Sequence, residues 1–479
     1  MANARFVTSL GVALCIASTA RAWVSTQNAR SGEGIAVALF ANGDLATASV
    51  YVDVSPADMG VARVDGATGA VVWRSDLGTA GADSPLGIAI DRDGNVVTVN
   101  SSSPGVIKLD GATGQPLWQI PVPGRVNAFA VDTFGDVVVG GSVLSGPLNQ
   151  EIVTKYSGAS GALLWTALPF GSYVRSLATD AHGDVFVASV VTGPDGSRRT
   201  ELRALTGSGG IGLWDLALPV SLPLLEDPAD LEIGGDGRLV ALLQDTVRSG
   251  SDEGFRSGDR VDTSWWTVVS ADAANGSLLW RTEIHAPSRS SFGVSAVSLA
   301  AGPNGDVYAC GGLGTPQNNS ILSFAVVALD PGTGEERWRH ILGGPLGFFG
   351  FAKDVAVAPD GSVIAAGLIS SKKTDASHLF VTSLRPRDGH AIWETTLELS
   401  TRPPPSGRPG LAVDPSGGIS VMGTAYVPLV GRSPATAKLA PDGTSFGVVS
   451  LAITPRPVAC CICTATCNDA RNPTAANSD

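Results

Sequence analysis

The stretch Val64-Asp65-Gly66-Ala67-Thr68-Gly69-Ala70-Val71-Val72-Trp73 is one of seven similar phrases that each end in a tryptophan. The clearest copies run from Leu109 to Trp118 and from Leu329 to Trp338. In all seven, a glycine stands four places before the tryptophan. Because glycine takes positive φ without strain, this position predicts a tight hairpin turn. The seven glycine–tryptophan pairs are Gly69–Trp73, Gly114–Trp118, Gly161–Trp165, Gly210–Trp214, Gly276–Trp280, Gly334–Trp338 and Gly389–Trp393.

A second phrase alternates with the first and consists of two apolar runs around a glycine turn. Examples are Gly87 to Val97 and Asp354 to Ile364. Apolar and β-branched residues on both sides of such a turn predict another hairpin. The eight turn glycines are Gly43, Gly94, Gly135, Gly183, Gly237, Gly305, Gly361 and Gly417.

Two hairpins make four strands, and the unit returns about every 50 residues, which is the size of a propeller blade. We therefore predict an all-β protein with a single β-propeller of about eight four-stranded blades, a seven-bladed ring being the alternative. Each repeated tryptophan should lie between neighbouring blades, where a large apolar ring can be buried. An eighth such position falls at Phe446 in a degenerate last repeat. Trp23 precedes the first glycine turn, so we expect its strand to pair into the last blade and close the ring.

The Asp-x-x-Thr-Gly-x-x-x-Trp phrase resembles the tryptophan-docking motif of pyrroloquinoline-quinone (PQQ)-type propeller repeats. The combined unit, as in Ile152 to Val187, is similar to the bacterial β-propeller repeat called SBBP. The resemblance covers roughly residues 34–451 and implies a propeller of the quinoprotein-like superfamily. Such repeats occur in quinone-dependent dehydrogenases and in non-enzymatic envelope and scaffold proteins. The motif aspartate is replaced by Ser157, Thr206 and Arg385 in three repeats.

The dehydrogenase alternative implies PQQ with calcium, and in that family a disulfide between adjacent cysteines lies beside the cofactor. Cys460 and Cys461 are adjacent, but they follow the last repeat, which is the wrong place. The family's calcium ligands and catalytic aspartate find no match, so no catalytic residue is assigned. Fold alone does not imply function, and we expect a protein without enzymatic activity and without cofactor or bound metal.

The C-terminal segment 456–479 is rich in cysteine and polar residues, and its structure is predicted to be poorly ordered. Three interpretations stay open: disulfides, as expected in an oxidising compartment; a zinc or copper site, because four thiols fall within eight residues; and an unstructured end. The four cysteines concerned are Cys460, Cys461, Cys463 and Cys467. By contrast, Cys310 lies in a strand phrase and is expected to be a small buried residue.

Residues 1–22 have the features of a secretory signal peptide. Arg5 precedes the apolar stretch from Phe6 to Ala20, and Ala20-Arg21-Ala22 fits a small-x-small cleavage site. Cleavage there leaves a propeller of residues 23–455 that is secreted, periplasmic or on the cell surface. The apolar stretch is shorter than the roughly 20 residues of a membrane span, and no later stretch is a candidate. A formal charge of −12 without basic clusters argues against nucleic-acid binding.

Three insertions lengthen the repeat at one register: Gln244 to Asp262, Leu313 to Ser320 and Ser370 to Ser377. Insertions at one register emerge on one face of a repeat protein. Loops on a rigid scaffold often carry recognition, so this loop face is expected to bind a protein or another surface ligand. The preferred function is an exported, non-enzymatic binding scaffold. The alternatives are a periplasmic PQQ-dependent dehydrogenase and a secreted hydrolase or lyase with a site built from loops.

Overall fold

The computed structural model describes residues 23–26 and 32–444, apart from short segments between strands. Those segments are 53–56, 79–82, 84, 101–104, 146–147, 169–170, 172, 193–197, 219–223, 248–262, 287–293, 303, 316–317, 343–347, 372–376, 398–409 and 428–430. Within the described ranges, no helix has the length and hydropathy that a membrane span requires.

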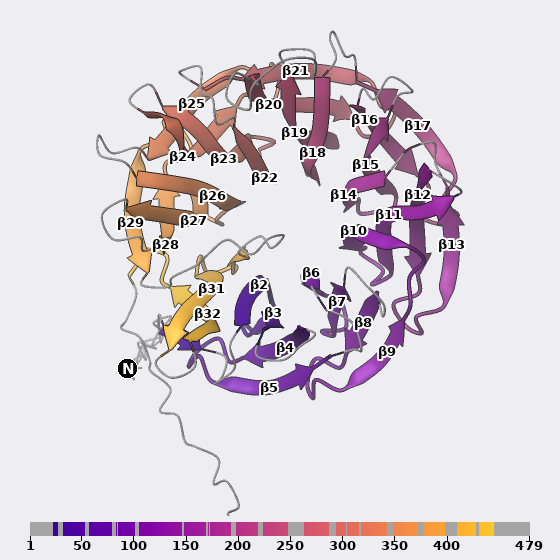
Figure 1. Ribbon diagram of the computed structural model, residues 1–479, viewed down its shortest axis with the longest axis horizontal. Coiled ribbons are helices and arrows are strands. Elements are labelled where there is room, and N and C mark those ends of the chain that lie inside the picture. The colour runs from indigo at the N-terminus through magenta and orange to yellow at the C-terminus, as the bar shows by residue number, and fades with distance from the viewer. Residues whose placement is uncertain are drawn as a thin grey trace, which may run out of the picture.

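The chain forms eight four-stranded antiparallel blades around a central axis, which confirms the predicted all-β propeller and fixes its blade number (Figure 1). Each blade runs from an inner strand at the axis to an outer strand at the circumference. The strands of the first four blades are β2 (Gly32–Leu39), β3 (Leu45–Tyr51), β4 (Asp58–Val64) and β5 (Val71–Asp76) in blade 1; β6 (Pro85–Ile90), β7 (Val96–Asn100), β8 (Val106–Leu109) and β9 (Pro116–Ile120) in blade 2; β10 (Arg125–Val131), β11 (Val137–Ser145), β12 (Leu148–Tyr156) and β13 (Leu163–Ala167) in blade 3; and β14 (Tyr173–Thr179), β15 (Val185–Thr192), β16 (Arg198–Leu205) and β17 (Gly212–Ala217) in blade 4.

The remaining blades repeat this order until the last, which borrows its outer strand from the N-terminus. The strands are β18 (Leu224–Ile233), β19 (Arg238–Val247), β20 (Thr263–Asp272) and β21 (Leu278–Ile284) in blade 5; β22 (Ser295–Ala301), β23 (Val307–Thr315), β24 (Asn318–Leu329) and β25 (Glu336–Leu342) in blade 6; β26 (Phe348–Val357), β27 (Val363–Ser371), β28 (Ser377–Leu384) and β29 (Ala391–Leu397) in blade 7; and β30 (Leu411–Val413), β31 (Ile419–Val427), β32 (Gly431–Leu439) and β1 (Trp23–Thr26) in blade 8. Since β1 pairs antiparallel with β32, the expected closure of the ring by the N-terminal strand is confirmed.

The glycines of both repeated phrases have φ between 65° and 85°, the left-handed conformation that their turns require. In the tryptophan phrase a second constraint acts on the glycine. A Cβ atom on Gly210 would lie 2.5 Å from Cε3 of Trp165 in the preceding blade. The equivalent glycines in the turns of blades 2, 3, 5, 6, 7 and 8 likewise lie against the tryptophan of the preceding blade. The glycine is therefore fixed by the backbone and by the tryptophan that covers it.

Each of the seven repeated tryptophans bridges its own blade to the next one. The indole Nε1 donates a hydrogen bond of 2.8–3.2 Å to a backbone carbonyl in the turn of the following blade. The pairs are Trp73–Gly111, Trp118–Gly158, Trp165–Gly207, Trp214–Ala273, Trp280–Pro331, Trp338–Pro386 and Trp393–Pro441. Burial and hydrogen bonding of these rings give every one of these interfaces the same anchor.

The eighth tryptophan position belongs to β1. Trp23 is paired with Lys438, as Trp118 is with Lys108 in blade 2. The alignment of the repeats placed this position at Phe446, which lies outside the described residues. The strand register thus makes Trp23 the eighth member of the tryptophan series.

Apolar clusters fill the spaces between adjacent blades. One cluster joins Trp73 and Met59 of blade 1 to Ile107 of blade 2, and similar clusters follow around the ring. Cys310 is fully buried in its strand, as expected, and forms no disulfide with another described residue. Trp266, also fully buried, belongs to the cluster between blades 5 and 6.

The three insertions all join the second strand of a blade to its third, so they share one connection of the repeat, as expected. Strands extend further into them than the sequence suggested: β19 continues to Val247, and β23 and β24 leave only residues 316–317 between them. Segments 1–22 and 456–479, with the signal peptide and the four tail cysteines, lie outside the described residues.

Candidate functional site

The eight blades can be compared at one equivalent position. In every blade, the outer-strand residue directly after the tryptophan pairs with one residue of the third strand. In blade 4 that residue is Arg203, paired with Asp215. In the other seven blades it is small or uncharged: Ala62, Ile107, Thr154, Val269, Val327, Thr382 and Ala437. An arginine here breaks the repeat, and such departures are expected where a protein serves function rather than folding.

Arg203 is surrounded by three carboxylates at the interface of blades 3 and 4. Its Nη1 donates to Oε2 of Glu151 in blade 3 at 2.9 Å, and its Nη2 pairs with Oε2 of Glu201. Its Nε lies 3.0 Å from Oδ1 of Asp215. The Ser189 hydroxyl, from β15, donates to the other oxygen of Glu151 at 2.5 Å. These contacts form a buried charged network at the interface of blades 3 and 4.

The network is deeply buried at one end and open at the other. The side chains of Glu151 and Arg203 are 0% and 4% exposed, whereas that of Asp215 is 72% exposed. Burial raises the pKa of Glu151, and the charge of Arg203 opposes this rise. A buried ion pair rarely adds stability over an apolar pair of similar volume. Stability therefore gives little reason for this arrangement.

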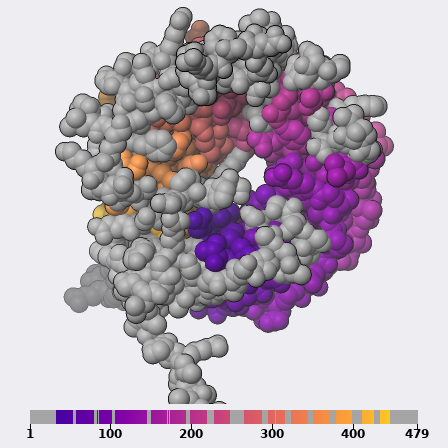
Figure 2. All heavy atoms as spheres, viewed as in Figure 1, coloured from indigo at the N-terminus to yellow at the C-terminus, as the bar shows by residue number. Residues whose placement is uncertain are grey.

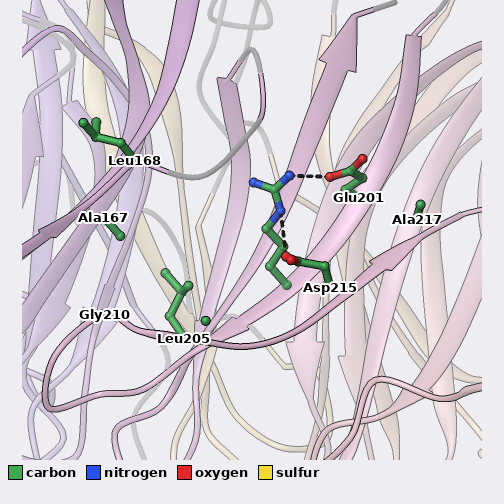
Figure 3. A pocket seen from close by; sticks show the side chains of 9 residues that line it. Ala167, Leu168, Glu201, Leu205, Gly210, Asp215 and Ala217 are labelled. Carbon is green, nitrogen blue, oxygen red and sulfur yellow. Dashed lines mark hydrogen bonds and ion pairs between the residues drawn. The ribbon is translucent and has the colours of Figure 1, made fainter.

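A cavity of about 570 Å³ opens beside Arg203. Figure 3 shows Glu201 and Asp215 on one wall and Ala167 and Leu168 on the facing strand. The remaining lining residues are Leu205, Gly210, Gly212 and Ala217. We call this space the blade 3–4 wedge. Its walls are apolar, and its charged groups gather at Arg203.

Exposed apolar side chains lie on and beside the outer strands of blades 3 and 4, and among them Leu168 lines the wedge. Of the thirteen large apolar side chains exposed in the described part of the chain, five lie at the ends of β13 and β17, and they are 49–69% exposed. They are Leu163, Leu164, Leu168, Ile211 and Leu213, and we call them the blade 3–4 rim. In Figure 2 the described surface of these blades, purple to magenta, reaches the outer edge of the ring. Concentrated apolar surface of this kind marks interaction sites.

A second polar group lies on the inner strands, near the axis. Ser298 Oγ is 3.1 Å from Asp230 Oδ2 and 3.0 Å from Asp354 Oδ1, and it links blades 5, 6 and 7. A hydroxyl carries one hydrogen, so Ser298 donates to one of these two carboxylates at a time. Burial, followed by the charge of Asp230, raises the pKa of nearby Glu232 to about 8.

The described residues do not fit a calcium-bound quinone at this place. Asp230 accepts a further bond from the Leu299 amide, and Asp354 accepts one from the Leu411 amide, so both carboxylates serve as brackets between blades. In the described ranges, no three His, Cys, Asp or Glu side chains are arranged to hold a metal ion.

The tryptophans predicted from the sequence have structural roles, whereas the sequence did not predict the residues of the wedge. The seven tryptophans join blades and do not line a shared cavity. The charge of Arg203 was visible in the sequence, and aligning the third strands of the repeats would have shown it against the small or uncharged residues elsewhere. Glu151 and Asp215 could not be recognised from the sequence, because their proximity to Arg203 depends on the strand face that each occupies, and only the strand register gives that face.

The fold and the repeated tryptophan anchors define a β-propeller of the superfamily that includes the PQQ quinoproteins. A family model described as outer membrane protein assembly factor BamB matches residues 57–222 and 149–403. Together these matches span more than half of the 479 residues, and the chain belongs to this family. No curated protein sequence matches the chain.

Several solved structures share the fold at low sequence identity. BamB from Moraxella catarrhalis is 15% identical with a TM-score of 0.46, over 84% of this chain and 95% of that one. The quinohemoprotein alcohol dehydrogenase ADHIIG from Pseudomonas putida HK5 is 13% identical with a TM-score of 0.51, over 96% and 79%. A europium-containing methanol dehydrogenase is 12% identical with a TM-score of 0.53, over 86% and 85%. At these identities the likeness concerns the fold alone.

Proposed function

We propose that this protein is an exported, non-enzymatic propeller that binds a protein partner through the outer edge of blades 3 and 4. The observation that carries the proposal is the blade 3–4 rim, five exposed apolar side chains on two adjacent blades, of which Leu168 lines the cavity between them. Solvent-exposed leucine and isoleucine side chains gain free energy when a partner covers them. The family's description as an assembly factor supports a role in binding other proteins.

Export and a place in the cell envelope belong to the same proposal. The expected cleavage site ends at Ala22, and β1 begins at the next residue, Trp23. Sequencing the N-terminus of the mature protein should therefore give Trp23 first. A mature protein that retains Met1 would contradict export by this route.

Photo-cross-linking in the native host tests the binding role. A photoreactive amino acid is placed at Leu168 or Leu213 in the rim, and at Gln119, an exposed outer-strand residue of blade 2, as a control. The expected result is a discrete adduct of one size from both rim positions and none from Gln119. Absence of adducts at the rim, or equal adducts at all three positions, would contradict the proposal.

A PQQ-dependent dehydrogenase is the alternative, favoured by fold likeness to the two dehydrogenases. Absorbance spectra of purified protein, with and without added PQQ and calcium, separate the two functions. The scaffold predicts no stoichiometric quinone signal and no alcohol oxidation. A quinone signal with turnover would replace the scaffold by the enzyme.

A further inference from the structure

We infer that the blade 3–4 wedge binds the lysine or arginine side chain of an extended partner segment that lies along β17. This inference deepens the proposed function and depends on it. It states which chemistry the partner presents and how the segment is aligned.

The charge of the wedge selects a cation. Three carboxylates, Glu151, Glu201 and Asp215, surround two guanidinium groups, because Arg199 pairs with Glu201 at 2.8 Å. Asp215 is the most exposed of the three, with a side chain 72% exposed against 11% for Glu201 and 0% for Glu151. A cation near Asp215 would balance the excess negative charge, while a second anion would be repelled. The formal charge of −12 for the whole chain favours the same sign of partner.

The shape of the wedge suits a long aliphatic side chain with a charged end. Its walls include Leu168, Leu205 and Ala217, and the carboxylates stand beside them. Lysine and arginine bury their methylene groups along apolar surface and keep the charge at a polar site. A bare metal ion would leave these apolar walls unused.

The edge of β17 sets the alignment of the segment. Within the described residues β17 pairs only with β16, so its other edge is available to an added strand. Leu213, Asp215 and Ala217 alternate with Trp214 and Leu216, and so they share the strand face opposite Trp214, which binds blade 5. A strand added to this edge would place alternate side chains beside Leu213 and Asp215. The segment should thus carry a bulky apolar residue two positions from a lysine or arginine.

Blade 7 provides a matched control for the acidic position. Ile392 and Glu394 occupy on β29 the places of Leu213 and Asp215 on β17. The third-strand residue opposite Glu394 is Thr382, not a buried arginine. Substitution of Glu394 therefore changes the same surface charge without touching the wedge.

The experiment measures fluorescence anisotropy of the full chain with three labelled synthetic peptides of about twelve residues. The peptides carry leucine at one position and lysine, norleucine or glutamate two positions away. At low salt the lysine peptide should bind about ten-fold more tightly than the norleucine peptide, and the glutamate peptide most weakly. Asp215→Asn should remove most of the preference for lysine, and Glu394→Gln should keep it.

Equal binding of the lysine and norleucine peptides would overturn the inference, as would a lysine preference that survives Asp215→Asn. Failure of all three peptides to bind would overturn it as well. The cross-linking experiment at Leu168 and Leu213 stands apart from these outcomes. Rim adducts without a lysine preference would leave the scaffold function in place and remove only the assignment of the wedge.

Discussion

Glu232 should make the stability of the propeller depend on pH, and the variant Glu232→Gln should remove that dependence. Glu232 lies on β18 with its carboxyl buried near Asp230 and Asp354. Its pKa rises from 4.5 to about 8, first because of burial and then because of the neighbouring negative charge. The folded protein therefore holds this proton more tightly than the unfolded chain does.

The sign and the size of the effect follow from this difference. The contribution to stability is fully present below about pH 4.5, falls as the pH rises toward 8, and stays lost above it. At about 1.36 kcal/mol for each pH unit, the rise corresponds to at most roughly 5 kcal/mol. Glutamine resembles the protonated acid in shape and cannot ionise. The variant and the original protein should be similarly stable near pH 5, and the variant more stable near pH 9.

Urea unfolding followed by tryptophan fluorescence at about pH 5 and pH 9 measures both free energies. Glu335→Gln is the control, since Glu335 is exposed in the turn before Trp338. The Glu335→Gln variant should change the urea unfolding midpoint by the same small amount at both pH values. If Glu232→Gln changed the free energy of unfolding equally at both pH values, the Glu232 carboxyl would ionise in the folded protein at little cost. That result would refute the argument that burial raises its pKa.

Three further substitutions test the interfaces between blades. Trp165→Ala should lower the free energy of unfolding by about 3–5 kcal/mol, because the ring is 7% exposed; a loss below about 1 kcal/mol in urea titration would contradict its role as an anchor. Trp23→Ala should lower the melting temperature much as Trp165→Ala does, since both hold the same register position; an unchanged melting temperature would place the eighth anchor elsewhere. Arg203→Met should cost about 3–5 kcal/mol by leaving Glu151 buried without its cation, and adding Glu151→Leu should restore most of the loss. If the double variant were as unstable as the single one, the pair would be holding the interface together.

The repeated phrases predicted the propeller because each of them states the same local requirement many times. Gly210 must adopt positive φ and Trp165 must cover it, and the four-residue step from such a glycine to the next tryptophan, as from Gly210 to Trp214, recurs in all seven tryptophan phrases. Turn chemistry and tertiary packing agree, so the repeat can be recognised without a structure. The place of Trp23 needed only one further step, the pairing of the two ends of the chain.

The wedge could not be predicted in the same way, because it has no repeated signal and depends on three different strands. Glu151, Arg203 and Asp215 come from β12, β16 and β17, and each is an ordinary charged residue in its own phrase. Only the strand register brings Arg203 opposite Asp215, and only the packing of blade 3 on blade 4 adds Glu151. The insertions drew attention to loops, whereas the wedge lies between strands of adjacent blades.

The interface that holds the wedge is also firmly joined at one end. Lys155 and Trp165 of blade 3 both donate hydrogen bonds to the Gly207 carbonyl of blade 4, at 2.9 and 3.0 Å. Lys155 also pairs with the buried Asp132 at 2.7 Å, so its position is fixed from both sides. The wedge reaches from Gly210, which Trp165 covers, to Leu168 beyond the end of β13. A side chain can therefore enter between the blades without forcing them apart. A site formed in advance loses less conformational entropy on binding, and this makes a rigid propeller interface a suitable place to recognise one charged side chain.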